Sequence, residues 1–539
     1  MNSREQQVRD DRSHPRVSEP VVFITLLVMA GGGAIIGLQI ITTLGVTPNT
    51  SLIGVLFAIM LSRVPITAFQ RFRSVHQQNL VQTTISSGTF GAANCMLLTI
   101  GIPVALDEPD LVMPMFAGAA MAMLIDLLML YWLYDSRIFP AKAAWPPGIA
   151  AAEAIIAGDQ GGKRAGVLLI GSGVGALGAF AGIPMSGAGV AFIGNIWALS
   201  MFAVGLFLAG YSDVFFSVTL SDTYIPHGVM IGAGLVALVQ AILLVVRRSG
   251  STADNALAPA VAGGAAEPTR SDQAALIGLG RGAVLYVLAG TVLALAGGLF
   301  TEMSPLMVIG FALFAAVACI AAEFIVGLSA MHAGWFPAFA TALVFLFIGM
   351  AVGFPAPAVV LMAGFVAAGS PAFADAGYDF KAGWVLRDRG RDPAFELEGR
   401  RQQLLAGLIG FVVAAVIVFF VHDIYFSNDL FAPSSRVFAA AIDAGLGPDT
   451  ITEILLWAVP GALIQVIGGS SRQMGVLLAT GLIVADPMAA YAVAGGLIVR
   501  IVVLRVKGAE SANMLAVFGG GIIAGDAVYS FADSLVKAR

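Results

Sequence analysis

The sequence is poor in charged residues. Only 11% of its 539 residues are Asp, Glu, Lys or Arg, against about 25% in a typical soluble protein. Hydrophobic residues make up 58% of the chain, and the mean hydropathy is +0.90. A soluble protein of this length would need more polar surface, and the short alternating segments of a membrane β-barrel are absent. The composition therefore predicts an all-α fold, a polytopic transmembrane helical bundle.

Cysteine and enzyme motifs are also scarce. The only two cysteines, Cys95 and Cys319, lie in apolar runs, which indicates packing residues and neither a disulfide nor a metal site. The chain has no Walker A sequence, no HExxH, no nucleophile elbow and no CxxC. Its five histidines do not cluster. We therefore expect no enzyme, no cofactor, no metal site and no direct use of ATP, and the net charge of −5 gives no sign of nucleic-acid binding.

Long apolar runs are abundant and divide the chain into membrane segments. A tail over residues 1–20 precedes an N-terminal half over 21–246, a linker over 247–273 and a C-terminal half over 274–539. The C-terminal half contains a polar loop over 375–403. Short segments at 146–157 and 434–446 are further candidates, and about 14–16 of all these stretches are expected to be membrane segments. The longer spans are expected at 21–46, 51–68, 82–105, 111–134, 165–182, 189–209, 226–246, 282–300, 305–326, 331–352, 355–373, 402–421, 451–468, 473–486, 488–505 and 513–532.

Lys and Arg gather in alternate loops. The tail, 63–73, 137–142 and 381–401 are basic, whereas the loops at 45–50 and 106–110 carry no Lys or Arg. This pattern predicts a cytoplasmic N-terminus in the cytoplasmic (inner) membrane. Counting 146–157 as a crossing element keeps Arg247 and Arg248 cytoplasmic but places Lys163 and Arg164 outside, so crossing and re-entrant alternatives both stay open.

The segment WPPGIAAAEAIIA, Trp145–Ala157, is too short to cross a bilayer. Pro146, Pro147 and Gly148 suit a helix start, and Glu153 follows among apolar residues. A short broken helix with a carboxylate at membrane depth is typical of transporter binding sites. We therefore list Pro147 and Gly148 as candidate substrate contacts and Glu153 as a candidate proton or substrate group.

Three further acids lie within apolar runs: Asp126, Glu323 and Asp526. Intramembrane carboxyl groups are costly, so each is a candidate for proton or substrate binding. Burial raises the pKa of a carboxyl group toward neutrality, which suits coupling to a proton gradient. A stabilising ion or hydrogen-bonded pair is the alternative for Asp126.

Two polar patches supply further candidate substrate contacts. In HQQNLVQTT, Gln78, Asn79 and Gln82 offer donors and acceptors, although an interfacial helix cap is the alternative. GGSSRQMG resembles a helix start at which a serine caps the helix and the cation favours an anion; a tight turn is the alternative. Its candidate contacts are Ser470, Ser471 and Arg472.

A faint internal repeat links the two halves. LLTIGIPVA at 97–105 is similar to LLATGLIVA at 477–485, and VMIGAGLVA at 229–237 is similar to VFGGGIIA at 517–524 with one gap. This favours two weakly related halves with broken or re-entrant helices, and a site between them.

Four segments in order resemble the oligopeptide transporter (OPT) family, particularly its yellow stripe-like and prokaryotic branch. HQQNLVQTTISSG resembles the family's polar cluster followed by VQT, and WPPGIAAAEAI resembles its Tyr-Pro-Ser-Gly-Thr-Ala segment. DFKAG at Asp379–Gly383 is similar to its Asp-Leu-Lys-Thr-Gly loop. GGGIIAGDAV is similar to its Ile-Ala-Gly-Glu segment, with Asp526 in place of the glutamate.

The resemblance implies proton-coupled symport of short oligopeptides or of metal–chelate complexes. We expect a secondary-active importer whose partners are a small-molecule substrate, protons and the lipid bilayer, and a homodimer stays open. A passive channel would need a continuous polar stripe, and an intramembrane enzyme would need a catalytic pair of residues.

Overall fold

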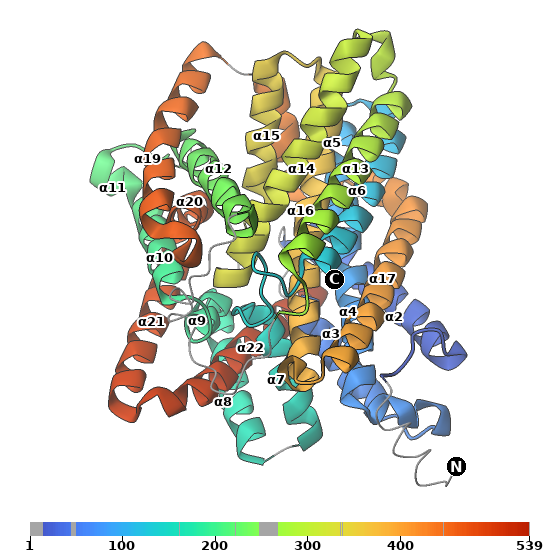
Figure 1. Ribbon diagram of the computed structural model, residues 1–539, viewed down its shortest axis with the longest axis vertical. Coiled ribbons are helices and arrows are strands. Elements are labelled where there is room, and N and C mark those ends of the chain that lie inside the picture. The colour runs from blue at the N-terminus through green and yellow to red at the C-terminus, as the bar shows by residue number, and fades with distance from the viewer. Residues whose placement is uncertain are drawn as a thin grey trace.

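The computed structural model describes residues 14–44, 50–160, 162–220, 223–246, 268–334, 336, 338–445 and 447–537 (Figure 1). Within these residues the regular structure is helical, apart from an isolated bridge between Tyr134 and Phe139. The prediction of an all-α helical bundle is therefore confirmed. Most of the predicted linker, residues 247–267, lies outside the described part of the chain.

The first half of the chain contains the helices α2 to α12. They are α2 Pro20–Leu44, α3 Thr50–Ser62, α4 Val75–Phe90, α5 Leu98–Ala105, α6 Val112–Leu133, α7 Pro146–Gln160, α8 Gly162–Phe180, α9 Met185–Ala191, α10 Ile196–Gly210, α11 Ser212–Phe216 and α12 Ile225–Val246. A π-helical stretch, Gly91–Leu97, joins α4 to α5.

The second half contains the helices α13 to α22. They are α13 Asp272–Ala296, α14 Pro305–Ala333, α15 Ala338–Val352, α16 Ala356–Leu386, α17 Pro393–Ser427, α18 Pro433–Ala444, α19 Pro448–Arg472, α20 Met474–Val484, α21 Pro487–Lys507 and α22 Ala512–Lys537. Several begin with proline at the first helical position, where its fixed φ and missing N–H cost nothing.

The outer faces of the helices are apolar. Ten helices in the described part of the chain are long and apolar enough to cross a membrane, and five shorter apolar helices accompany them. Large hydrophobic side chains stay exposed on these faces, such as Leu306 at 79% and Val506 at 78%. Such surfaces are stable in lipid, where the backbone groups are satisfied within each helix. The chain is therefore a multi-pass membrane protein.

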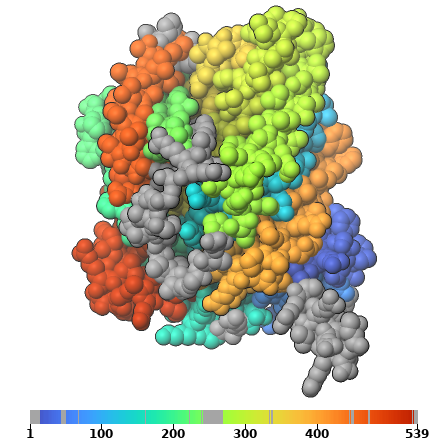
Figure 2. All heavy atoms as spheres, in the orientation of Figure 1, coloured from blue at the N-terminus to red at the C-terminus, as the bar shows by residue number. Residues whose placement is uncertain are grey.

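The two halves of the sequence interleave in space. Helices α4 and α6 of the first half pack on α17 and α16 of the second. Elsewhere α8, α10 and α12 pack on α22, α20 and α19, in the reverse order along the chain. Figure 2 shows α12, in green, beside α19, in orange. There are thus two groups of packed helices, one with α4, α6, α16 and α17 and the other with α8, α10, α12, α19, α20 and α22. Each group contains helices from both halves of the sequence.

Small residues allow the closest of these contacts. Gly525 on α22 lies against the backbone of Ser172 on α8, and Gly175 on α8 lies against the backbone of Ile522. A Cβ atom at either glycine would overlap main-chain atoms of the facing helix. Close backbone approach through small residues is the usual way in which membrane helices associate.

The predicted polar loop over 375–403 is wrong. Helix α16 continues to Leu386, α17 begins at Pro393, and only a short turn separates them. Many polar side chains of this region are buried and hydrogen-bonded, among them Asp379, Lys381 and Glu396, so hydropathy alone gave the wrong assignment.

The predicted span over 189–209 is interrupted. Helix α9 ends at Ala191, and α10 begins at Ile196. Between them the Asn195 side chain accepts hydrogen bonds from Trp197 N at 3.0 Å and Ala198 N at 3.2 Å, which caps α10. The guanidinium of Arg500 is buried and donates to the carbonyls of Ala191 and Gly194 at 3.0 and 2.7 Å, which satisfies the broken end of α9.

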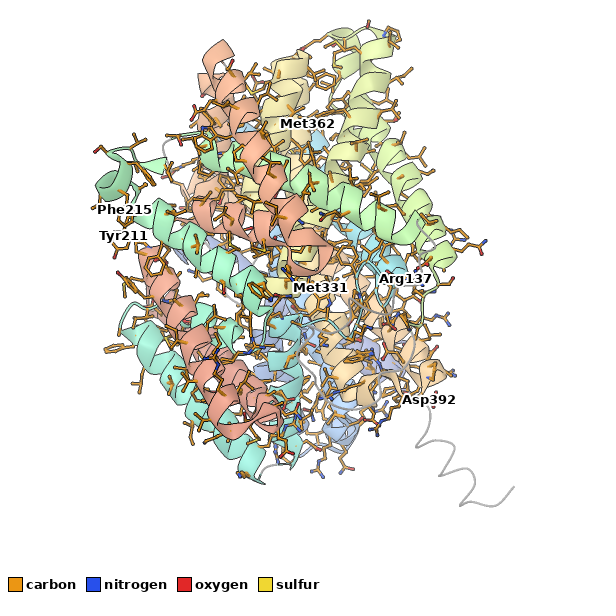
Figure 3. All side chains as sticks on the ribbon, turned by 60° about the vertical axis from the view of Figure 1, so that its left-hand side comes forward. Arg137, Tyr211, Phe215, Met331, Met362 and Asp392 are labelled. Atoms are coloured by element: carbon orange, nitrogen blue, oxygen red, sulfur yellow. The ribbon has the colours of Figure 1, made fainter. Side chains whose placement is uncertain are left out.

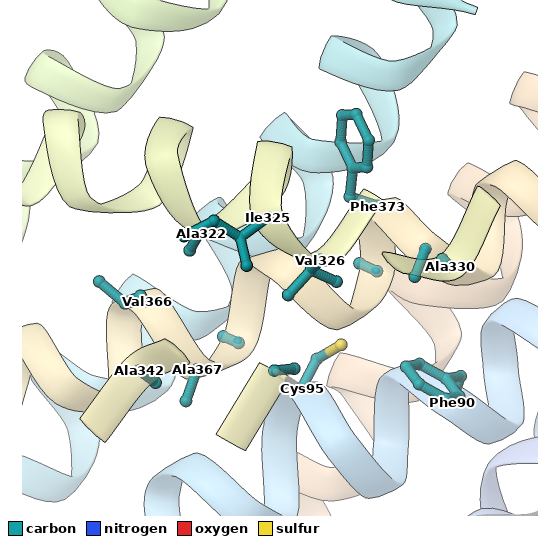
Figure 4. Close-up of a cluster of buried hydrophobic side chains, with 14 of the residues drawn as sticks. Phe90, Cys95, Ala322, Ile325, Val326, Ala330, Ala342, Val366, Ala367 and Phe373 are labelled. Atoms are coloured by element: carbon teal, nitrogen blue, oxygen red, sulfur yellow. The ribbon is translucent and has the colours of Figure 1, made fainter. Parts of the chain in front are cut away.

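A continuous apolar core joins the central helices. Figure 4 shows Phe90 and Cys95 in one cluster with side chains of α14 and α16, among them Val326 and Phe373. Both Cys95 and Cys319 are free and buried in this core. Figure 3 shows side chains along every helix, with Met331 in the interior and Phe215 at the periphery.

Candidate functional site

A cavity of about 570 Å³ lies among elements from both halves of the sequence. Its walls come from α4, α7, α16, α18 and α22, and from the segments that precede α9 and α15. This volume falls within the range of small-molecule sites, about 300–1,000 Å³. The break before α9 and the start of α7 both reach the cavity, so its wall contains irregular backbone as well as helix.

Four aspartates line the cavity: Asp375, Asp486, Asp526 and Asp533. The described residues of its wall include no Lys, Arg or His. Asp486 also caps α21, because its Oδ1 accepts from Met488 N at 2.8 Å and Ala489 N at 3.2 Å. Such an arrangement concentrates negative potential and favours cationic groups.

Asp526 is a predicted site residue that lines the cavity. Its Oδ2 accepts a hydrogen bond from Ser186 N at 2.9 Å and one from Ser186 Oγ at 2.5 Å. These bonds join α22 to α9 and hold the carboxylate at the wall.

Aromatic side chains form the apolar part of the wall. The ring centroids of Phe336 and Tyr378 are 6.4 Å apart, those of Phe90 and Phe336 are 6.0 Å apart, and those of Phe339 and Phe438 are 4.8 Å apart. All five side chains line the cavity. The site therefore combines carboxylates with a large apolar surface.

The start of α7 is fixed against α16. Pro147 lines the cavity, and Gly148 packs on the carbonyl of Tyr378 and the side chain of Lys381, where a Cβ would not fit. Trp145 N donates to Met331 O at 2.9 Å, and Trp145 has a φ of +40°. The predicted proline-opened helix therefore begins at the cavity wall.

Glu153 lies elsewhere. It is buried on α7 and forms a two-pronged ion pair with Arg164 of α8, in which Arg164 Nε donates to Oε2 at 2.6 Å. It is absent from the described lining of the cavity. The pair ties together the two arms of the α7–α8 hairpin.

The far end of α7 lies beside a basic segment. Arg63 Nη2 donates to Gly158 O at 2.8 Å, so the α7–α8 turn is on the same side as residues 63–73. Fifteen residues of helix span about 22 Å, less than the ~30 Å hydrocarbon core. This favours the re-entrant alternative for 146–157, since Lys163 and Arg164 then share a side with Arg63.

A buried polar chain starts at the cavity wall. Ser86 Oγ donates to Asp375 Oδ1 at 2.9 Å, and the Ser86 and Ser51 hydroxyl oxygens are 3.2 Å apart. Ser51 Oγ donates to Asp379 Oδ1 at 3.0 Å. The same Asp379 oxygen accepts from Gln82 Nε2 at 2.5 Å, and Asn79 donates to Gln82. Helices α3, α4 and α16 supply these groups.

The predicted contacts Asn79 and Gln82 thus belong to this series of hydrogen-bonded side chains and not to the described cavity wall. Gln78 is also buried and donates to Arg73 O at 3.2 Å. Sequence reasoning missed Asp375 and Asp379 because it placed them in a loop. The DFKAG segment, which contains Asp379, was the available signal.

An ion cluster lies beyond Asp379. Gln403 Nε2 donates to Asp379 O at 2.6 Å, and its Oε1 accepts from Arg387. Glu396 then pairs with both Arg387 and Arg400, and all three of these charged side chains are 0% exposed. This cluster fixes the turn between α16 and α17.

The N-terminal segment covers this cluster. His14 is buried, and its ring centroid lies 5.3 Å from that of Phe395. Burial, with a smaller contribution from Arg387, lowers the pKa of His14 to about 3. Val17 N donates to Gln402 Oε1 at 2.8 Å, which ties the same segment to α17.

Asp126 and Glu323 form a separate carboxyl pair. Both side chains are 0% exposed, and Tyr286 OH donates to Glu323 Oε1 at 2.6 Å, whereas the Asp126 oxygens have no hydrogen-bond partner among the described residues. Helices α6, α13 and α14 supply the three groups. Two adjacent buried carboxyl groups cannot both ionise without a cation, so this pair can hold a proton.

GGSSRQMG forms the junction between α19 and α20. The backbone kinks at Gly469, which has a φ of +70°, α19 ends at Arg472, and Gln473, with a φ of +48°, precedes α20. Gln465 Oε1 accepts from Gly475 N at 3.1 Å and Val476 N at 3.3 Å, so a side chain of α19 already satisfies the start of α20. Arg472 lies over the Trp197 ring at 5.1 Å, and the side chains of Ser470 and Ser471 lie outside the described part of the chain.

In the described part of the chain, no group of three or more His, Cys, Asp or Glu residues could hold a metal ion. The site is therefore a polar and aromatic cavity next to buried carboxyl groups, surrounded by membrane helices. Comparison with known families agrees with this geometry, since residues 20–247 and 222–536 match the OPT oligopeptide transporter protein family.

The chain belongs to the oligopeptide transporter family. The match covers nearly all of the described helices. A comparison with curated proteins gave no match. The family is one of transporters, which agrees with a small-molecule substrate and with a role other than catalysis.

Proposed function

We propose that this OPT-family protein is a proton-coupled symporter that imports short oligopeptides across the cytoplasmic membrane. The observation that carries the proposal is the cavity, which combines four aspartates and an aromatic wall with no described Lys, Arg or His. A peptide presents a cationic α-ammonium group and apolar or aromatic side chains. Both find complementary partners in this cavity.

Asp526 is our candidate for the ammonium-binding group. It lies at the wall, and Ser186 holds its carboxyl group there through two hydrogen bonds. Pro147, at the start of α7, also lines the cavity. Movement of the α7–α8 hairpin relative to α16 would open and close the cavity, as broken helices do in secondary transporters.

The Asp126–Glu323 pair is our candidate for storing a coupling proton. Both carboxyl groups are fully buried, and Tyr286 OH donates a hydrogen bond to Glu323. Glu153 is a weaker candidate, because Arg164 already neutralises it. We assign Glu153 to the stability of the α7–α8 hairpin.

The basic segments 63–73 and 381–401 support a cytoplasmic N-terminus. The contacts of Arg63 with Gly158 and of Gln402 with Val17 hold the N-terminal segment and the α7–α8 turn near these basic regions.

Metal–chelate complexes are the second candidate substrate. The observation in their favour is the acidic lining of the cavity, which would attract a complex with net positive charge. Competition separates the two candidates, because a chelate substrate would inhibit peptide uptake at concentrations at which the free chelator does not.

The test is uptake of labelled di- to tetrapeptides into proteoliposomes with an imposed pH gradient. We expect concentrative uptake with an acidic exterior and a loss of at least tenfold in Asp526→Asn. The matched control is Asp423→Asn, since Asp423 is 92% exposed on α17. Uptake that is indifferent to the gradient would contradict proton coupling, and inhibition by an Fe(III) or Cu chelate would favour the second candidate.

A further inference from the structure

Helix α13 carries a single cation, and that cation lies on the lipid-facing side of the helix. Arg281 is exposed, and it shares one face of α13 with Ile277, Val284, Leu288 and Val292, at spacings of three or four residues. These four apolar residues are 47–60% exposed, and α13 is one of the helices long and apolar enough to cross a membrane. A charge on a lipid-facing surface is costly, so Arg281 requires a counter-charge.

The described residues supply no such counter-charge. Within this part of the chain Arg281 forms neither an ion pair nor a hydrogen bond. Asp272, the only acid of α13, pairs with Arg137 at 3.3 Å and lies about two and a half turns away, so its side chain leaves the opposite face of the helix. Asp135, just after α6, lies 3.5 Å from Arg400 and accepts from Thr269 Oγ1 at 2.7 Å.

Trp132 of the neighbouring helix α6 holds the guanidinium in place. The Arg281 guanidinium carbon is 6.0 Å from the centroid of the Trp132 ring. Gly278, one turn earlier on α13, allows this approach, because a Cβ atom there would lie 2.6 Å from Trp132 Cβ. An arginine that rests on an aromatic ring keeps its N–H donors free for a planar anion.

The guanidinium is directed toward the membrane surface. Helix α13 has 25 residues and is about 37 Å long, so it exceeds the ~30 Å hydrocarbon core and its first turns reach the headgroup region. The Cα–Cβ bond of Arg281 leans toward these first turns. Long arginine side chains in this position extend their charged end to the interface while the stem stays on apolar surface.

We propose that Arg281, resting on Trp132, binds the phosphate group of an anionic phospholipid. The guanidinium supplies a positive charge and paired N–H donors, which match phosphate oxygens. Val284, Leu288 and Val292 continue from Arg281 toward the middle of the membrane and offer the acyl chains an apolar surface. A phospholipid combines the missing negative charge with chains that cover this stripe, whereas a soluble anion would leave the stripe bare.

The lipid site does not depend on the proposed symport function, because neither Arg281 nor Trp132 lines the described cavity. Both residues lie on the outer surface formed by α6 and α13, which pack against each other (Figure 1). Failure of peptide transport would therefore leave the lipid site standing.

Native mass spectrometry of the full-length protein in detergent tests the proposal. We expect the first molecule of phosphatidylglycerol to bind about fivefold more tightly than phosphatidylcholine with the same acyl chains, which is the effect of one interfacial arginine. Arg281→Gln should abolish this preference, and Arg281→Glu should invert it. The matched control is Arg505→Gln, since Arg505 is also exposed but lies in the last turn of α21, and it should keep the wild-type preference.

Three results would overturn the proposal. The first is an equal preference for phosphatidylglycerol in wild type and Arg281→Gln when both variants keep the wild-type Tm without added lipid. The second is displacement of the lipid by inorganic phosphate at an equal concentration, which would indicate an anion site to which the acyl chains contribute nothing. The third is a dimer that dissociates in Arg281→Gln with no change in lipid preference, which would assign this face to contact between two copies of the chain.

Discussion

Replacement of Glu396 by glutamine should destabilise the protein far more than loss of a surface carboxylate. Glu396 accepts hydrogen bonds from Arg387 at 2.7 Å and from Arg400 at 3.0 Å, and all three side chains are 0% exposed. The variant leaves two buried guanidinium groups, with Asp135 at 3.5 Å from Arg400 as the remaining carboxylate. Loss of one partner from a buried ion pair costs about 3–5 kcal/mol.

Asp388→Asn is the matched control. Asp388 pairs with Arg391 in the adjacent turn, but these side chains are 68% and 70% exposed. Its loss should cost less than about 1 kcal/mol. At about 2.1 cal/mol/K per residue, the entropy of unfolding for 539 residues converts the Glu396 cost into a fall in Tm of about 3–4 °C.

The two cysteines provide the assay. Cys95 and Cys319 are 0% and 2% exposed, so a thiol-reactive dye reports unfolding in detergent. We expect the Tm of Glu396→Gln to fall by about 3–4 °C. The Tm of Asp388→Asn should stay within about 1 °C of the wild-type value. Equal shifts in the two variants would refute the assignment of the buried cluster as a major source of stability.

Three further predictions concern packing, helix ends and pH. Gly525→Val should cost about 1–3 kcal/mol, because the new side chain meets the α8 backbone; Gly173→Val, which has open space, should show a much smaller fall in Tm. Gln465→Leu should cost about 2 kcal/mol, since two N–H groups of α20 lose their acceptor; an unchanged Tm would contradict this. The pKa of His14 is lower when the N-terminal segment is attached to α17 than when it is released, so the released segment binds more protons. The attachment therefore weakens as the pH falls below 6.5, and this weakening levels off near pH 3. Hydrogen exchange at Val17 N, corrected for its intrinsic rate, should lose about 25-fold of protection between pH 7 and pH 5, and His14→Gln should remove this dependence.

The sequence was sufficient for the helices whose character depends on local properties. Long apolar runs predicted the spans because a helix in lipid satisfies its own backbone. Pro146 and Pro147 marked the start of α7 because proline fixes the first helical turn. Asp126 and Glu323 were identified as unusual because a buried charge is costly, and both are fully buried.

The contacts that could not be predicted from the sequence are those between residues that are distant along the chain. Asp379 was assigned to a loop, yet its acceptor oxygen is satisfied by Ser51, 328 residues away. Similarly, nothing in the sequence indicated that Gln465 accepts from Gly475 N, a contact that exists because the fold places its amide at the start of α20. Local patterns carry no information on such contacts, and they also leave open which helices of the two halves pack together.

Proton movement driven by the substrate tests the central claim most directly. Proteoliposomes that contain a pH-sensitive dye are exposed to a dipeptide without an imposed gradient, and the internal pH is followed. Proton-coupled import predicts acidification of the interior that depends on the peptide, saturates with its concentration and is lost in Asp526→Asn but kept in Asp423→Asn. Peptide entry with no change in internal pH would contradict it.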